Sequence, residues 1–197
     1  PFSQSSTQLF PFGTILEYGE RKFRYAQMDG AVTAGKLLQS SVAVTNHVDL
    51  NAQAAASAGD TSVSVTLGGT LVVENQYAEG YLHVNDNGGQ GQLLRIKQHP
   101  AADASATLTL TLYDKVTTAL TTLGGSKIDL IKSIFKDVVV APATETGAVV
   151  GVTTIDMTDN YYGWIQVSGP CSVLTSGTLV VGHMAVRSDT LDGAVEP

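Results

Sequence analysis

The sequence predicts an all-β fold, organised as a barrel or sandwich, and three features lead to this prediction. The segment Ala104–Tyr113 alternates strictly, with Leu108, Leu110 and Leu112 on one side and threonines on the other, which is the period of a half-buried strand. Glycine and proline interrupt such segments at intervals of roughly 8–12 residues, as in barrels and sandwiches. No stretch carries the pattern of a long amphipathic helix.

Residues 1–13 (PFSQSSTQLFPFG) are predicted to form an extended N-terminal arm. Their prolines and small polar residues disfavour both a helix and an interior strand. A disordered terminus is the alternative, but Phe2, Phe10 and Phe12 are large apolar side chains, which favour an anchored segment. We interpret them as anchors that fit a groove on a neighbouring molecule.

The strands follow in order after the arm. Residues 14–18 and 21–26 flank Gly19 and predict a hairpin, while the Ala-, Asn- and Gln-rich region 46–60 predicts a connection. A single helical turn is expected at 117–123. The remaining predicted strands are 61–67, 80–84, 92–98, 104–113, 135–140, 148–157, 161–168, 171–174 and 178–185.

This order of segments predicts three parts. After the arm (1–13), residues 14–45 and 138–197 together form the main β domain. Residues 46–137 form a second β lobe inserted into it, together with its connections.

Composition favours a protein that covers part of its surface with other chains. Hydrophobic residues make up 43% of the 197 residues and charged residues only 15%, which is well below the usual quarter. The longest apolar stretches, such as Val138–Ala141, are far shorter than the roughly 20 residues of a membrane helix, so no membrane partner is expected. We therefore expect oligomerisation or docking onto a larger assembly.

Charge and cysteine content limit the partners and the cellular compartment that we expect. The net charge of −7 argues against direct binding to nucleic acid, which needs a basic footprint. A single cysteine, Cys171, excludes an internal disulfide and fits assembly in a reducing cytoplasm. The first residues have neither the charged nor the apolar region of a signal peptide, so none is expected.

No residue pattern predicts catalysis, a cofactor or a metal, and we expect the chain not to be an enzyme. Residues 83–89 (HVNDNGG) faintly resemble a calcium loop, but His83 and Leu94 replace the first and last acidic ligands, so a hairpin turn is expected. Cys171 has no basic neighbour and is interpreted as a small buried apolar residue. The four histidines lack metal-site spacing and are expected to be surface or partly buried residues: His47, His83, His99 and His183.

Basic residues are few but partly grouped. Lys22 and Arg24 share one face of a predicted strand beside Arg21, and Arg95 and Lys97 share another. Such groups are either solvated outer faces or a patch that meets an acidic partner and sets its orientation.

Four segments resemble parts of tailed-phage capsid decoration (cement) proteins, and together they span most of the chain. They are Arg21–Leu37, Gly80–Asp86, Ile96–Pro100 and Tyr161–Gly182, rich in aromatic residues, glycine and alternation. The resemblance implies a structural virion protein on the outer capsid surface, made in the host bacterial cytoplasm. It would clamp adjacent major capsid protein subunits, as a homotrimer by analogy with such proteins.

The candidate contacts with the capsid or another partner are the aromatic and basic residues of the arm, the first hairpin and the 161–168 strand. They are Phe2, Phe10, Phe12, Arg21, Lys22, Arg24, Tyr161 and Tyr162. An alternative function is a host-recognition domain of a phage tail or head fibre, which would bind glycans through a patch of Tyr161, Tyr162 and Trp164. A small hydrolase or lyase on a β scaffold is a third hypothesis.

Overall fold

A computed structural model describes residues 1–122 and 125–197, and these residues are almost entirely β. The one helix among them is a single 3₁₀ turn, η1 (Thr45–His47). The prediction of an all-β fold is confirmed. The chain divides into two compact units, which we call the split unit (Pro1–Val42 with Ile134–Pro197) and the inserted unit (Ala43–Ser133). The sequence pattern put the corresponding boundaries at 45/46 and 137/138.

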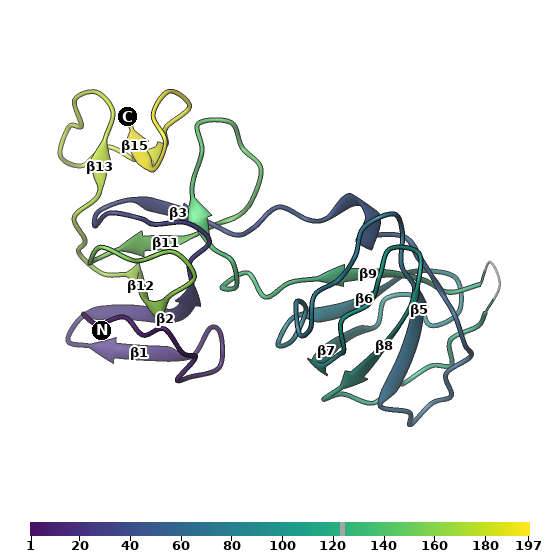
Figure 1. The fold of residues 1–197 in the computed structure, drawn as a ribbon. Helices are drawn as coiled ribbons and strands as arrows, with labels where there is room; N and C mark the ends of the chain where they lie inside the picture. Colours follow the sequence, from purple (N-terminus) through teal and green to yellow (C-terminus); the bar gives the residue numbers. More distant parts are fainter. Residues whose placement is uncertain (123–124) are drawn as a thin grey trace. The chain divides into compact units, whose positions relative to one another are not determined.

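The split unit is built on a six-stranded antiparallel sheet (Figure 1). β1 and β2 form a hairpin through Gly19, whose φ of +61° lies in the left-handed region that glycine enters without steric cost. In sheet order the strands are β1 (Ile15–Tyr18), β2 (Arg21–Gln27), β12 (Tyr162–Ser168), β11 (Val149–Thr153), β3 (Leu37–Gln39) and β10 (Val139–Val140).

The two faces of this sheet carry different side chains, because successive residues of a strand point to opposite sides. Ala26, Met28 and Ile165 belong to the apolar core on one face. Tyr25 and Trp164 are cross-strand partners on β2 and β12 and lie on the other face. The N-terminal arm covers this second face.

The C-terminal residues add a small three-stranded sheet to the split unit. β15 (Ala194–Glu196) lies between β13 (Leu174–Thr175), to which it is parallel, and β14 (Val186–Arg187), to which it is antiparallel. Val195 of this sheet packs beside Leu37 and Val152 of the larger one. The small C-terminal sheet is therefore attached to the six-stranded sheet through a second, smaller apolar cluster.

Several predicted strands of the split unit are shorter than expected or absent. The predicted strand 178–185 is wrong, since these residues form a loop between β13 and β14 with exposed side chains and no core to cover. Of the predicted strands 171–174 and 135–140, only Leu174 and β10 are in a sheet. An apolar run therefore indicates a strand only where another element packs against it.

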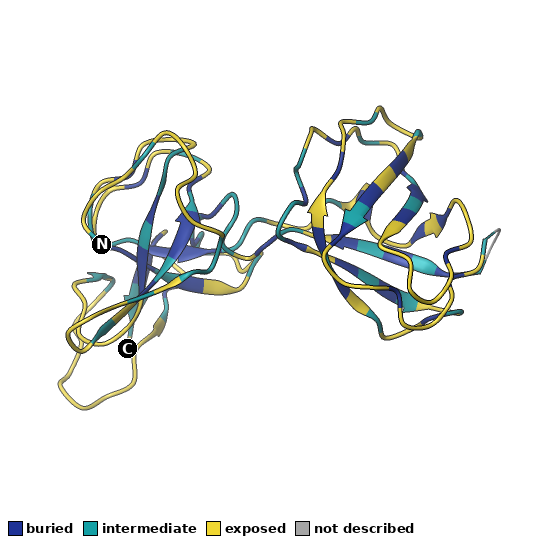
Figure 2. Cartoon of the chain, turned by 90° about the horizontal axis from the view of Figure 1, so that it is seen from below, coloured by how far each residue is buried: buried dark blue, intermediate teal, exposed yellow. Residues whose placement is uncertain are grey.

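The inserted unit is a closed six-stranded antiparallel barrel. Leu108 and Leu110 are fully buried inside it while Thr107 and Thr109 face outward, and Figure 2 shows this alternation of burial along the barrel strands. In barrel order the strands are β4 (Leu50–Ala52), β5 (Ser62–Thr66), β8 (Thr107–Leu112), β7 (Leu93–Gln98), β6 (Tyr81–Asp86) and β9 (Lys127–Ile131).

The sequence pattern missed the two strands that close the barrel. β4 lies inside the region 46–60 that was predicted as a connection, and with three residues it is too short to show a clear alternation. β9 places only Ile128 and Leu130 inward, and the exposed Ile131 at its end obscures the alternation. The predicted helical turn at 117–123 is wrong for residues 117–122, which form bends, a bridge and the start of a non-helical turn, and residue 123 lies outside the described residues.

Candidate functional site

The N-terminal arm folds back onto the sheet of its own chain. Ser5 pairs with Tyr162 at the start of β12 through two backbone hydrogen bonds, each 2.9 Å long. The Leu9 N–H donates to the Tyr25 hydroxyl at 3.0 Å, and the Thr158 N–H donates to Oε1 of Gln4 at 2.8 Å. The arm thus forms the same kind of backbone pairing that an added peptide strand makes.

Aromatic contacts fix the arm over one face of the sheet. The ring centroid of Phe10 lies 5.3 Å from those of both Tyr25 and Trp164. Phe12 stacks on Tyr162 with centroids 6.1 Å apart, and Phe2 meets Phe23 edge-on at 6.1 Å. We call the receiving surface, made of Phe23, Tyr25, Tyr162 and Trp164, the aromatic groove.

Burial within the groove agrees with this role for the arm. Phe23 and Tyr25 are only 0% and 2% exposed, although neither belongs to the apolar cluster under the sheet. Phe2 and Phe10 remain 48% and 44% exposed, so they cover the groove while presenting their outer sides to solvent.

Two of the predicted basic contacts hold the ends of the arm. The Arg21 guanidinium lies over the Phe2 ring at 5.2 Å, and Nη1 of Arg24 donates to the Gly13 carbonyl at 2.7 Å. Each cation–π contact of this kind contributes about 0.5–1 kcal/mol at exposed sites. Lys22 instead forms an exposed ion pair with Glu17 at 3.0 Å.

The predicted aromatic patch of Tyr161, Tyr162 and Trp164 is not an open surface. Tyr162 and Trp164 contact Phe12 and Phe10 of the arm, and Tyr161 is half-buried. Trp164 is also half-buried in the groove. Tyr162 and Trp164 therefore form part of the surface to which the arm binds.

A second candidate surface lies in the loop between β13 and β14, at residues 178–185, which we call the apolar loop. Val181 is fully exposed and Met184 is 83% exposed, while Val180 is 57% exposed. Exposed apolar side chains are normal singly, but a contiguous group indicates an interaction site. Sequence reasoning missed this surface because the run Leu179–Val181 was interpreted as a strand.

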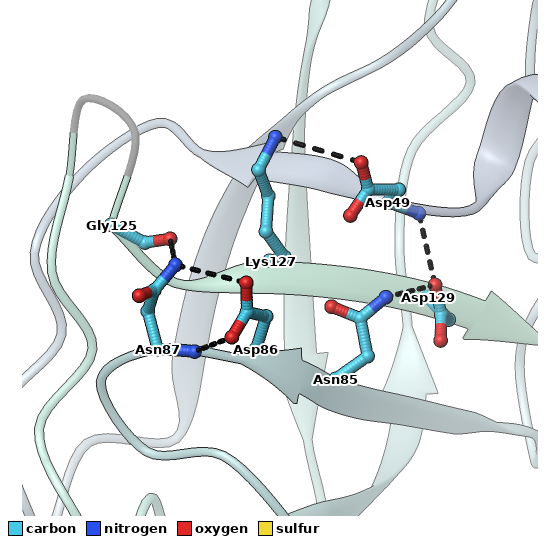
Figure 3. A network of polar contacts seen from close by, with 7 residues as sticks. All are labelled: Asp49, Asn85, Asp86, Asn87, Gly125, Lys127 and Asp129. Atoms are coloured by element: carbon cyan, nitrogen blue, oxygen red, sulfur yellow. Dashed lines mark hydrogen bonds and ion pairs between the residues drawn. The ribbon is translucent and has the colours of Figure 1, made fainter.

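A polar network on the outside of the barrel has a structural explanation (Figure 3). Oδ1 of Asp129 on β9 accepts from the Asp49 N–H next to β4 and from Nδ2 of Asn85 on β6, both at 2.9 Å. Nζ of Lys127 lies 3.7 Å from the Asp49 carboxylate. The network links β4, β9 and β6, and it therefore supports the seam at which the barrel closes.

The loop that resembled a calcium site is a turn between β6 and β7, as predicted. Asn87 has a φ of +59° there, and its backbone N–H donates to Oδ1 of Asp86 at 2.8 Å. The Asn87 side chain also donates to the Gly125 carbonyl at 3.0 Å (Figure 3). The residues thus satisfy one another within the turn.

Two histidines are more deeply buried than the sequence indicated. His47 and His99 are 0% and 3% exposed. Nδ1 of His47 is hydrogen-bonded to the Tyr77 hydroxyl, and Nε2 of His99 accepts from the Tyr77 N–H at 2.9 Å. Both histidines therefore belong to a structural hydrogen-bond network around the buried Tyr77.

The prediction of a buried Cys171 is wrong. The thiol is exposed, because the chain after Gly169-Pro170 runs outside any strand.

In residues 1–122 and 125–197, no three His, Cys, Asp or Glu side chains are placed to hold a metal ion. In the same residues no helix has the length and apolarity needed to cross a membrane. Comparisons with known proteins found no matching family model, no matching curated protein and no matching solved structure.

Proposed function

We propose that the chain is a structural virion protein that decorates and stabilises an icosahedral phage capsid by clamping adjacent major capsid protein subunits. The observation that carries this proposal is the apolar loop, where Val180, Val181 and Met184 offer side chains to solvent without a partner in the described chain. The sequence segments that resemble capsid decoration proteins support the same role.

The physical basis of such a clamp is contact area on a stiff scaffold. Stable protein interfaces bury on the order of 1,200–2,000 Å² in total, and a few apolar or aromatic anchors supply most of the energy. Both units have their own buried core, so their loops are held by rigid β elements. Several weak contacts per oligomer add by avidity, which suits the homotrimer that the resemblance implies.

The capsid would be stabilised because binding of the protein is thermodynamically linked to the state of the shell. A protein that binds only the mature shell lowers the free energy of that shell relative to its disrupted state. The net charge of −7 fits binding to protein rather than to the packaged nucleic acid. The proposed place of action is therefore the outer capsid surface.

A glycan-binding role for Tyr161, Tyr162 and Trp164 has less support. Phe10 and Phe12 of the arm cover the groove that holds two of these side chains. A sugar ring would need that aromatic surface to be free.

The experiment that tests the proposal compares two matched substitutions for binding to purified capsids that lack the protein. Val180→Asp places a charge in the apolar loop, whereas Val73→Asp changes an equally exposed valine of the barrel, 55% against 57%. We expect Val180→Asp to weaken capsid binding at least tenfold and Val73→Asp to leave it close to wild type. Equal binding by wild type and Val180→Asp, or no binding by the wild type, would contradict the proposal.

A further inference from the structure

We propose that the aromatic groove accepts the N-terminal arm of a second copy, so that neighbouring copies link by exchanging arms. This inference goes beyond the proposed function, because it concerns contacts between copies of this chain and requires no capsid. Its partner is already present in the structure: the segment that fits the groove is residues 2–12 of the same sequence.

Every contact of the arm with the groove is non-covalent and local to the arm. Ser5 supplies the strand-like pairing with Tyr162, while Phe2 and Phe10 supply the ring contacts. None of these contacts depends on which chain the arm belongs to. An arm from a second copy would form them with the same geometry, and this conservation of contacts is what makes exchange of identical segments a low-cost route to oligomers.

The link between arm and body permits such an exchange. Gly13 has a φ of +75° and its N–H donates to the Tyr25 carbonyl at 2.9 Å, so the chain turns at this residue before β1. Pro11 fixes its own φ and disfavours helical conformations of Phe10. The chain bends at Phe10 and turns at Phe12 and Gly13. A change of conformation at Gly13 alone would redirect the whole arm away from its own groove.

Concentration decides which groove the arm occupies. A tethered segment meets its own groove at an effective concentration in the millimolar range, so the closed form dominates in dilute solution. Copies held side by side on a surface reach comparable local concentrations. Exchange is then favoured where the chain conformation at Gly13 has a lower free energy in the exchanged form than in the closed form. Each exchanged arm links two copies.

The test uses the only tryptophan of the chain, Trp164, whose ring contacts Phe10 in the groove. A full-length chain with Phe10→Ala and Phe12→Ala has a weakened arm, and circular dichroism checks its fold. A synthetic peptide of residues 1–13 is then titrated while Trp164 emission is recorded. The control peptide carries alanine at positions 2, 10 and 12.

We expect the wild-type peptide to shift Trp164 emission of this variant back towards that of the wild-type chain, with saturation. The wild-type chain should need at least ten times more peptide, because its own arm competes. The control peptide should have no effect. A folded variant whose emission does not respond to millimolar peptide, or responds equally to both peptides, would overturn the proposal.

A second measurement covers the case in which the double variant does not fold. Light scattering on the wild-type chain over a concentration series should show a rising average mass. An excess of the wild-type peptide should lower this mass because it occupies the grooves, whereas the control peptide should not. A wild-type mass that stays that of one chain up to millimolar concentration, or a rise that the wild-type peptide leaves unchanged, would overturn the inference as well.

Discussion

Replacing Phe10 by alanine should release the arm while leaving the β fold intact. Phe10 is 44% exposed, so a little over half of its surface is buried against Tyr25 and Trp164. For a side chain of about 200 Å², burial of roughly 110 Å² at about 25 cal/mol per Å² corresponds to ~2–3 kcal/mol as an upper bound. A loss of about 2 kcal/mol changes the docking equilibrium of the arm roughly 30-fold.

Trp164 emission measures this equilibrium directly. Removal of the Phe10 ring opens one side of the indole to water, so we expect a red shift and easier quenching by iodide. Amide hydrogen exchange at Ser5 should become faster, since its backbone pairing with Tyr162 holds only while the arm is docked. Far-ultraviolet circular dichroism should not change.

Leu9→Ala is the matched control, because Leu9 is the adjacent arm residue and its side chain is 64% exposed. It should leave Trp164 emission and Ser5 exchange close to wild type. If Phe10→Ala also leaves both unchanged, the arm is not held by its aromatic contacts. If instead Phe10→Ala unfolds the sheet, the arm is an integral layer of the split unit and not a separable segment.

Three further predictions concern other parts of the chain. Asp129→Ala should lower the free energy of unfolding of the barrel by about 1.5–3 kcal/mol, because it removes hydrogen bonds from Asp49 and Asn85 to a charged acceptor. Denaturant unfolding measures this loss, and the control is Asp103→Ala, which removes an exposed loop carboxylate. The Ser188 hydroxyl donates to Glu196 at 2.7 Å and is the main cause of that carboxyl's lowered pKa. The C-terminal sheet should therefore keep this stabilisation above the ordinary glutamate pKa of about 4.3 and lose it as pH falls through the lowered pKa, a dependence absent from Glu196→Gln in hydrogen exchange measured against pH. Heads without the protein should lose DNA at lower temperature than heads that carry it, as followed by dye access on heating, and equal survival would remove the support for a stabilising role.

Alternation and turn residues were sufficient to predict the fold class and most central strands. The Thr and Leu alternation of β8 survives in the structure because each leucine enters the barrel core. β4 and β9 were missed because each places only two apolar residues inward, which gives little periodic signal. The pairing of Leu50 with Ile128 on these neighbouring strands makes them part of the barrel. No local pattern in the sequence reveals such long-range pairing.

The candidate surfaces were only partly visible in the sequence. The three phenylalanines of the arm stood out by composition, but the groove that receives them combines β2 and β12, which lie about 140 positions apart in the chain. Arg21 and Arg24 were noted for their charge, whereas their observed contacts are with Phe2 and Gly13 of the arm. The apolar loop was mistaken for a strand, because Leu179–Val181 has the composition of one and nothing local reveals that no layer covers it.

Counting copies of the chain on purified virions tests the structural role most directly. Quantitative mass spectrometry against the major capsid protein would give the ratio. A protein that clamps the shell should be present in hundreds of copies per particle, in fixed proportion to the capsid subunits. A handful of copies, or recovery only with the tail fraction, would contradict the account.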